Sequence, residues 1–242
     1  MQDERTVVVH RASELIGLPT RRGFLKALAA GGSLVLMPSV FAACTDDNVT
    51  NVVTTTDPQT IRLSNDAGIF TFAFVLEQLE STFYEQIVRS FPQLFTAVEL
   101  ELLADIRNDE VVHREFLRAA LGNGFPNLTF DFSSVGTINR VSALQTALTL
   151  ETTGIAAYNG AGAAIKNPNN LLVAGKIVSV EARHTAAIAD TLDTTGTAYA
   201  DLTVPERAGL GASNANALDG AAAPSVIAAK AQPFIVNRIT LA

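Results

Sequence analysis

The sequence predicts an all-α fold, a four-helix bundle of two helical hairpins joined by a long crossover, with an irregular C-terminal segment. Three observations support this. Apolar residues recur at three- and four-residue steps from about Ser64 onward, which is the period of an amphipathic helix. Residues 122–137 carry glycine, asparagine and proline at the density of a long loop. One pattern of acidic, tyrosine and histidine residues occurs on each side of that loop.

Composition permits a folded domain and limits its chemistry. The chain has 242 residues, 48% hydrophobic and 17% charged, which suits a packed core and excludes a disordered protein. The single cysteine, Cys44, excludes an intramolecular disulfide network and any site built from several thiolates. A net charge of −7 argues against a broad surface for nucleic acid, so we expect no such partner. Any metal site must therefore use carboxylates and imidazoles.

Residues 1–43 are predicted to be a signal peptide. Residues 20–26 are cationic, and the apolar stretch 27–41 is too short to span a membrane. Arg21 and Arg22 stand in the order Thr-Arg-Arg-Gly-Phe-Leu-Lys, which resembles a twin-arginine translocation signal, with an ordinary secretory signal as the alternative. The resemblance implies the twin-arginine translocation machinery as a partner, and a bacterial or archaeal protein exported in folded form to the periplasm or cell envelope.

Cys44 is a candidate lipidation site. Residues 41–44, Phe-Ala-Ala-Cys, resemble a lipobox, whose cysteine becomes the lipidated first residue of a membrane-anchored lipoprotein. Phe41 departs from the usual aliphatic residue, and residues 40–42 offer a competing cleavage site that would leave a soluble exported protein. Residues 44–63 are predicted to be a flexible tether, because threonine, aspartate and asparagine dominate much of this stretch.

The first hairpin is expected to contain helices at residues 66–90 and 97–121. The first helix ends at Phe91 because the proline that follows disfavours helix at its predecessor. The second begins at a capping box formed by Thr96 and Glu99, and it closes at a glycine.

The second hairpin is expected to contain helices at residues 138–166 and 169–193, divided by an Asn-Pro-Asn-Asn turn. The four helices define a predicted bundle domain at 64–194. A C-terminal extension at 195–242 follows, rich in alanine, glycine and threonine, with a short helix expected near 224–232.

Histidine is scarce, and its positions are informative. Signal cleavage removes His10, and the two remaining histidines each follow a glutamate by three residues, as Glu110-x-x-His113 and Glu181-x-x-His184. This step places both side chains on one helix face, where they could reach one metal site. Either pair alone is more typical of a solvated helix surface than of a metal site.

The preceding helices repeat a second pattern. Glu77 is followed after seven residues by Tyr84, and Glu151 is followed after seven by Tyr158. Seven residues is nearly two helical turns, so each pair shares a face, with its glutamate inside an apolar stretch where an unpaired charge is costly. The glutamates of the two patterns are separated by 33 residues in the first half and by 30 in the second. These spacings indicate an internally duplicated helical hairpin.

This arrangement resembles the ferritin-like superfamily over residues 66–193. One glutamate from each of two helices and a Glu-x-x-His from each of the other two form the ligand set of its di-iron and di-manganese bundles. The phenylalanine-rich residues 70–80 and the Pro-Phe-Ile at 233–235 are similar to exported bacterial relatives of desiccation-related proteins. The resemblance implies a dinuclear centre of two Fe or Mn ions, with the ligands Glu77, Glu110, His113, Glu151, Glu181 and His184.

The resemblance also implies that Glu110 and Glu181 bridge the two metals, while Glu77 and Glu151 each bind one. Carboxylate oxygens with one imidazole per metal suit Fe or Mn, and the lack of thiolates argues against soft metals.

Four further residues are expected near the ligands or at the surface. Asp109 either orients a ligating histidine through a hydrogen bond or is an exposed helix charge. Tyr84 and Tyr158 either donate to ligands or pack in the core with satisfied hydroxyls. Glu80, one turn after a proposed ligand, either approaches the site or lies at the surface.

Two functions follow as hypotheses. The first is a di-metal oxidoreductase that acts on O₂ or peroxide, as a ferroxidase, a peroxide scavenger or a manganese-catalase-like enzyme. The second is a stress- or desiccation-protective or metal-sequestering structural protein without turnover, because fold and ligands alone do not choose a chemistry. Glycines at 154, 160 and 162 leave room for a neighbouring helix or a second subunit, so a homo-oligomer stays open.

Overall fold

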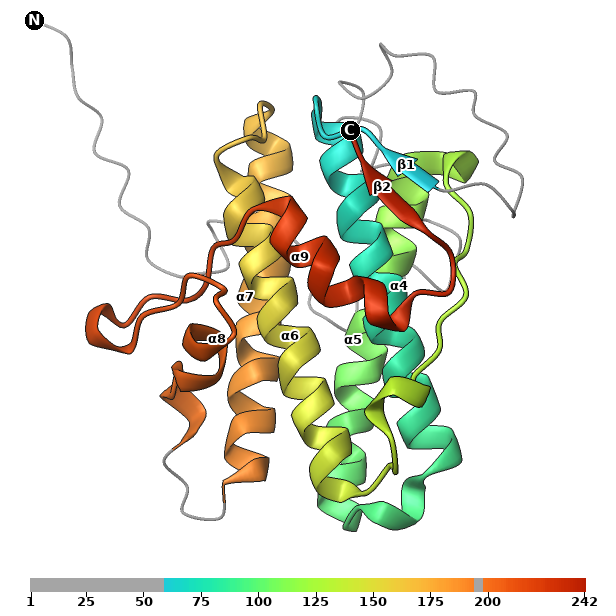
Figure 1. Ribbon diagram of the computed structural model, residues 1–242, viewed down its shortest axis with the longest axis vertical. Helices are drawn as coiled ribbons and strands as arrows, with labels where there is room; N and C mark the ends of the chain where they lie inside the picture. Colours follow the sequence, from blue (N-terminus) through green and yellow to red (C-terminus); the bar gives the residue numbers. More distant parts are fainter. Residues whose placement is uncertain (1–58, 194–197) are drawn as a thin grey trace, which may run out of the picture. The chain divides into compact units, whose positions relative to one another are not determined.

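Two helical hairpins lie side by side in the computed structural model, which describes residues 59–193 and 198–242 (Figure 1). The first consists of α4 (Asp66–Ser90) and α5 (Ala97–Leu121), and the second of α6 (Arg140–Gly162) and α7 (Pro168–Leu192). The predicted all-α bundle is confirmed. Among the described residues, no helix is both long enough and apolar enough to cross a membrane.

The sequence-predicted export features fall outside the described residues. These features are the signal peptide at 1–43 with Arg21 and Arg22, the lipidation residue Cys44, and most of the tether at 44–63.

Helix ends follow local capping chemistry. The capping box at Thr96 is present, since its hydroxyl accepts from the Glu99 amide at 3.3 Å and the Glu99 carboxylate accepts from the Thr96 amide at 2.8 Å. α6 begins two residues later than expected because Asn139 caps it, accepting from the Ser142 amide at 3.0 Å. It also ends four residues earlier, at Gly162, where two nearby glycines weaken the helix.

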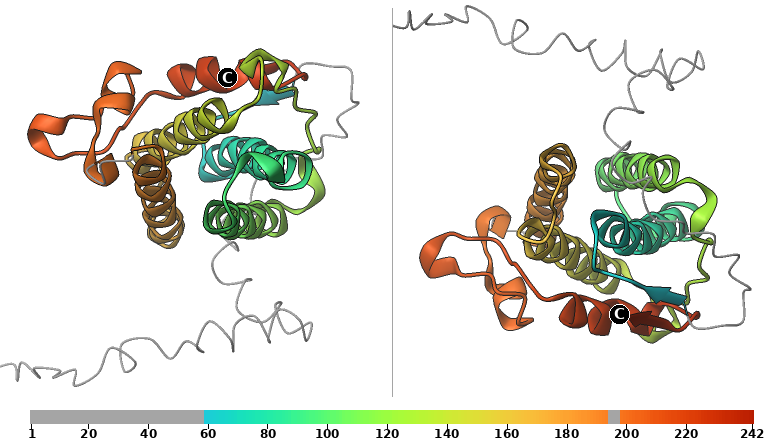
Figure 2. Two further views of the ribbon diagram at one scale, coloured as in Figure 1. Left: turned by 90° about the horizontal axis from the view of Figure 1, so that it is seen from below. Right: turned by 90° about the horizontal axis from the view of Figure 1, so that it is seen from above.

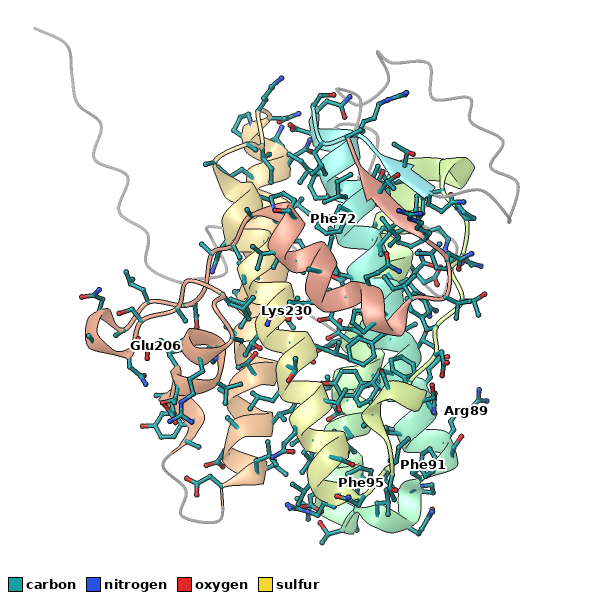
Figure 3. The ribbon with its side chains drawn as sticks, viewed as in Figure 1. Phe72, Arg89, Phe91, Phe95, Glu206 and Lys230 are labelled. Atoms are coloured by element: carbon teal, nitrogen blue, oxygen red, sulfur yellow. The ribbon has the colours of Figure 1, made fainter. Side chains whose placement is uncertain are left out.

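Buried apolar side chains from all four helices hold the hairpins together, and phenylalanines close one end of the bundle. Phe91 and Phe95 lie there, where α4 turns into α5 (Figure 3). At the α6–α7 turn, Asp66 accepts from the backbone amides of Lys166 at 2.8 Å and Asn167 at 3.0 Å. This bond set ties the start of α4 to the second hairpin, so the helices of both hairpins keep a fixed register.

The long crossover between the hairpins is held by a buried amide. Gln78 on α4 accepts from the Leu128 backbone amide at 2.9 Å, which satisfies a polar group inside the core. The side chain of Arg140 forms an ion pair with Glu99, and it donates to the Thr191 carbonyl at 2.8 Å. These bonds join the crossover to α4, and they join the start of α6 to α5 and to α7.

The C-terminal segment covers one side of the bundle. α8 (Thr203–Arg207) precedes α9 (Pro224–Ala231), which lies across the face made by α4 and α6 (Figures 1 and 2). The chain ends in β2 (Ile239–Leu241), which pairs in parallel with β1 (Gln59–Ile61). β1 lies inside the stretch predicted to be a tether, so ordered structure begins before residue 63.

Candidate metal centre

Each helix of the bundle places at least one glutamate in its interior. Glu77 of α4, Glu110 of α5, Glu151 of α6 and Glu181 of α7 are all 0% exposed. Four carboxylates cannot stay charged in a dry core without cations or protons, because burial of an isolated charge is strongly unfavourable. Their convergence therefore marks a site that requires positive charge.

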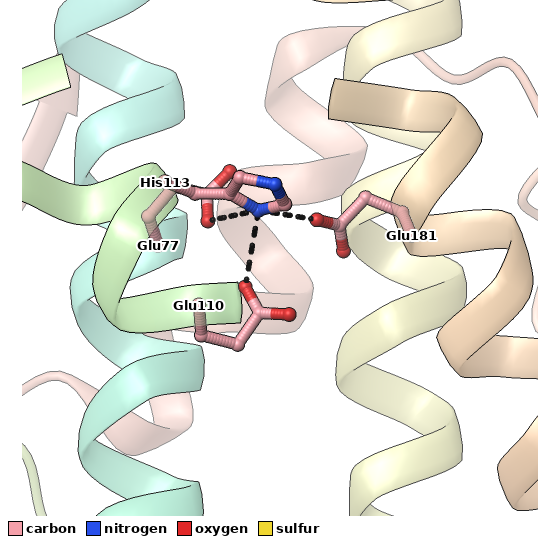
Figure 4. A group of neighbouring side chains, drawn as sticks. All are labelled: Glu77, Glu110, His113 and Glu181. Carbon is pink, nitrogen blue, oxygen red and sulfur yellow. Dashed lines mark ion pairs between the residues drawn. The ribbon is translucent and has the colours of Figure 1, made fainter. Parts of the chain in front are cut away.

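His113 faces three of these carboxylates (Figure 4). Its Nδ1 atom lies 3.4 Å from Glu77, 3.7 Å from Glu110 and 3.1 Å from Glu181. The three-residue step from Glu110 places the two side chains on one face of α5, as the sequence predicts. Glu181 reaches this ring from the other hairpin, so the group joins both halves of the molecule.

His184 occupies the matching place in the second half. Its Nδ1 atom lies 2.8 Å from Glu110 and 3.4 Å from Glu151. Its Nε2 atom lies 3.3 Å from the Asp109 carboxylate, whose side chain is 58% exposed. Asp109 is thus both an exposed helix charge and a partner of a buried imidazole, so each of the two sequence hypotheses holds in part.

The six residues form two overlapping groups, each able to hold a metal ion. One group is Glu77, Glu110, His113 and Glu181, and the other is Glu110, Glu151, Glu181 and His184. Within each group, ligand atoms lie within 4.8 Å of one another. Glu110 and Glu181 belong to both groups, which is the geometry expected of bridging ligands.

The buried carboxylate oxygens without a hydrogen-bond partner are not spread evenly over the four glutamates. Both carboxylate oxygens of Glu110 and of Glu181 are buried without a hydrogen-bond partner. Glu77 and Glu151 each have one such oxygen, Oε2. The Nδ1 atoms of both histidines complete the set of eight atoms. Buried polar atoms are rarely left unpaired, so this donor set fits metal ions as the missing partners.

The two tyrosines account for the remaining oxygens of the outer glutamates. The Tyr84 hydroxyl donates to Oε1 of Glu151, and the Tyr158 hydroxyl donates to Oε1 of Glu77, both at 2.5 Å. Each bond runs from one hairpin to the other. Burial, and then the neighbouring carboxylate charge, raise the pKa of both tyrosines, so their hydroxyls remain donors. Each tyrosine thereby fixes one carboxylate and leaves its Oε2 atom facing the centre.

Proton affinity within the site is high. Burial, followed by the charge of Glu181, raises the pKa of Glu110 to about 7, and burial with the charge of Glu77 raises that of Glu181 to about 8. Burial lowers the pKa of His113, but the carboxylates around it outweigh this effect and raise its pKa well above the usual value. Protons therefore neutralise the site when it holds no metal, and metal binding would displace them.

Glu80 is a fifth buried glutamate beside the centre, with 2% exposure. Burial and then the charges of the surrounding glutamates raise its pKa well above the usual value. A Cβ atom at Gly154 would lie 2.9 Å from Glu80 Oε1 and 3.4 Å from Glu181 Oε2. Glu80 is thus buried beside the centre and not at the surface, although it belongs to neither group of candidate ligands. Its three-residue step from Glu77, the same as that between Glu110 and His113, is the signal in the sequence.

Comparison with known protein families agrees with this geometry. A family model described as a ferritin-like domain matches residues 65–194, which is more than half of the chain. No curated protein matches the chain.

Proposed function

The chain belongs to the ferritin-like domain family, and we propose that it binds two Fe or Mn ions and carries out redox chemistry with O₂ or peroxide. The carrying observation is the convergence of eight buried ligand atoms from six side chains, none of which has a hydrogen-bond partner. Hard oxygen donors with one imidazole per ion favour Fe or Mn. When bound, such a pair would supply a one-electron change at each ion.

The distribution of unpartnered oxygens supports a specific assignment of the carboxylates. Glu110 and Glu181 each have two oxygens without a hydrogen-bond partner and belong to both groups, so they would help to hold both ions. Glu77 and Glu151 each have one, because a tyrosine hydroxyl occupies the other, and each would bind a single ion.

Asp109 would set the protonation of one imidazole. Its carboxylate lies beside Nε2 of His184 and would accept the proton of that atom when metal is bound, which leaves the lone pair of Nδ1 for the metal between Glu110 and Glu151. A lone pair that faces carboxylate oxygens is repelled unless a cation lies between them. Asp109 therefore favours the form of His184 that binds metal.

Metal analysis tests the binding. We expect protein purified from its native host to contain about two Fe or Mn ions per chain, and a metal-free or zinc-only protein would contradict the proposal. Glu110→Gln should lose the metal. Glu101→Gln, on an exposed position of the same helix, should retain it.

Turnover needs a separate measurement. Protein loaded with Fe²⁺ without oxygen is exposed to O₂ or to hydrogen peroxide, and the remaining Fe²⁺ is followed with a chromogenic chelator. We expect Fe²⁺ loss well above that of Glu110→Gln. Full loading without accelerated Fe²⁺ loss would contradict redox activity and favour the protective or metal-sequestering role.

We also propose export by the twin-arginine pathway and lipid attachment at Cys44. Transport of folded protein would allow the centre to acquire its metal before export. Replacing Arg21 and Arg22 with lysine should leave the protein in the cytoplasm, and Cys44→Ser should release it from the membrane fraction. Unchanged localisation of both variants would contradict this part of the proposal.

A further inference from the structure

An apolar cavity lies near the carboxylate cluster, with Tyr158 in its lining. It has a volume of about 120 Å³ and is bounded by α4, α6, α7 and the C-terminal segment. Phe72, labelled in Figure 3, lies on α4 in its wall, and Ile227 on α9 lies in the wall as well. Ala73, Ala174 and Tyr158 line the part that faces the bundle interior.

The lining excludes polar occupants. All its side chains are apolar except that of Tyr158, and the Tyr158 hydroxyl already donates to Glu77 at 2.5 Å. A buried water molecule normally needs two to four polar partners, so this cavity offers little to water. An apolar molecule would give up no hydrogen bonds on leaving water, and it would gain van der Waals contacts with the apolar side chains of the lining.

Its outer wall is held in place by specific bonds. The Ala222 amide donates to the Ala156 carbonyl at 3.0 Å, and the side chain of Asn159 donates to the Gly220 carbonyl at 2.9 Å. A Cβ atom at Gly160 would lie 2.1 Å from the Ala222 carbonyl oxygen, so only glycine permits this contact. The C-terminal extension is therefore bonded to α6 along the cavity wall. A loose packing defect would not be expected to have such a wall.

We propose that this cavity binds one small apolar molecule, of the size of benzene or a short alkyl group, against the ring of Tyr158. An apolar cavity of about 150 Å³ is known to hold benzene, and 120 Å³ is too small for a long acyl chain. Binding itself does not require the metal centre. The bound molecule would lie beside Tyr158, which donates to Glu77. That Glu77 is a metal ligand rests on the proposed function.

Calorimetric titration of the metal-free full chain with benzene tests the binding independently of the metal. We expect one site per chain with a Kd of about 1 mM or tighter, which is within the affinity that six carbon atoms can supply. Ala73→Leu and Ala174→Leu, which fill the cavity from α4 and from α7, should each weaken binding at least tenfold. Ala119→Leu, at an exposed position of α5, should bind as the wild type does.

Two results would overturn the proposal. One is the absence of benzene binding by the wild-type protein, and the other is equal binding by both filled variants. If a filled variant fails to fold, a wild-type crystal under xenon pressure gives a second measurement. The proposal requires a xenon peak in the cavity, and the absence of that peak would contradict it. Because no metal is present in the titration, its outcome is independent of the metal analysis that tests the proposed function.

Discussion

The two hairpins supply the same ligands but different neighbours. The matching ligands are Glu77 and Glu151, Glu110 and Glu181, and His113 and His184. Glu80 follows its ligand by three residues in α4, and the equivalent position in α6 is Gly154. Asp109 precedes its ligand in α5, and the equivalent position in α7 is Val180.

These differences have a structural consequence. Gly154 lacks the side chain that would occupy the space into which Glu80 extends. Asp109 contacts His184 of the opposite hairpin, and Val180 has no carboxylate to offer His113. The candidate ligand positions are thus nearly symmetric, while the neighbouring groups Glu80 and Asp109 have no counterpart in the second hairpin. We expect the two metal positions to differ in affinity.

The largest expected effect comes from the shared carboxylates. Glu110→Gln and Glu181→Gln should each weaken Mn²⁺ binding by about 100-fold or more at both positions, because each residue belongs to both groups. Glu77→Gln should leave one ion bound. Metal content after dialysis against a weak chelator measures this, and two retained ions in Glu110→Gln would refute the shared role.

The pH dependence of stability should invert when metal binds. Glu110 and Glu181 have pKa values of about 7 and 8 in the folded chain against 4.5 otherwise, so the folded state holds more protons. Unfolding free energy of the metal-free protein should therefore fall as pH rises from about 4.5 through 8. The raised pKa values of both histidines act in the same direction above pH 6.5, whereas the lowered pKa of Glu77 has its effect mainly below pH 4.5, outside this range.

Urea unfolding at pH 5, 6, 7 and 8 measures this trend. Loading with Mn²⁺ should reverse it, since metal competes with these protons. A metal-free protein whose stability rises steadily over this range would contradict the assigned pKa shifts.

Asp109→Asn tests the asymmetry between the two halves. Loss of its charge should weaken one of the two ions by about 10- to 100-fold and leave the other unchanged, because Asp109 contacts His184, which belongs to one of the two candidate groups. Two-site calorimetry with Mn²⁺ resolves the affinities. Equal weakening of both ions would show that Asp109 acts through the general field of the site.

Gly154→Ala should have the smallest effect. The new Cβ would meet the end of the flexible Glu80 side chain, which can shift, and alanine favours helix by about 1 kcal/mol. We expect the unfolding free energy to change by no more than about 1 kcal/mol. Gly160→Ala in the same helix is the contrast, because its Cβ would meet backbone and should clearly destabilise the protein. Thermal unfolding of both variants distinguishes a movable neighbour from a fixed one.

Local spacing explains what could be predicted from the sequence. The steps of three and seven residues fix the relative directions of side chains on one helix, so they associate Glu110 with His113 and Glu77 with Tyr84 before any tertiary structure is known. The capping box and the turn prolines define helix ends for the same reason.

Spacing within one helix does not predict contacts between the two hairpins. The sequence does not reveal that Asp109 contacts the histidine of the other hairpin, nor that each tyrosine donates to a glutamate across the bundle. The pairing of β1 with β2 joins residues 180 positions apart, and strands of three residues carry no periodicity. Such features depend on how helices pack, which single-helix patterns do not encode.

Anomalous X-ray diffraction from crystals soaked with Mn²⁺ would show directly whether the bundle holds two ions. We expect two manganese peaks per chain inside the bundle, both bound by Glu110 and Glu181, one with His113 and the other with His184. A single peak, peaks confined to the surface, or none at all at saturating Mn²⁺ would contradict a dinuclear centre.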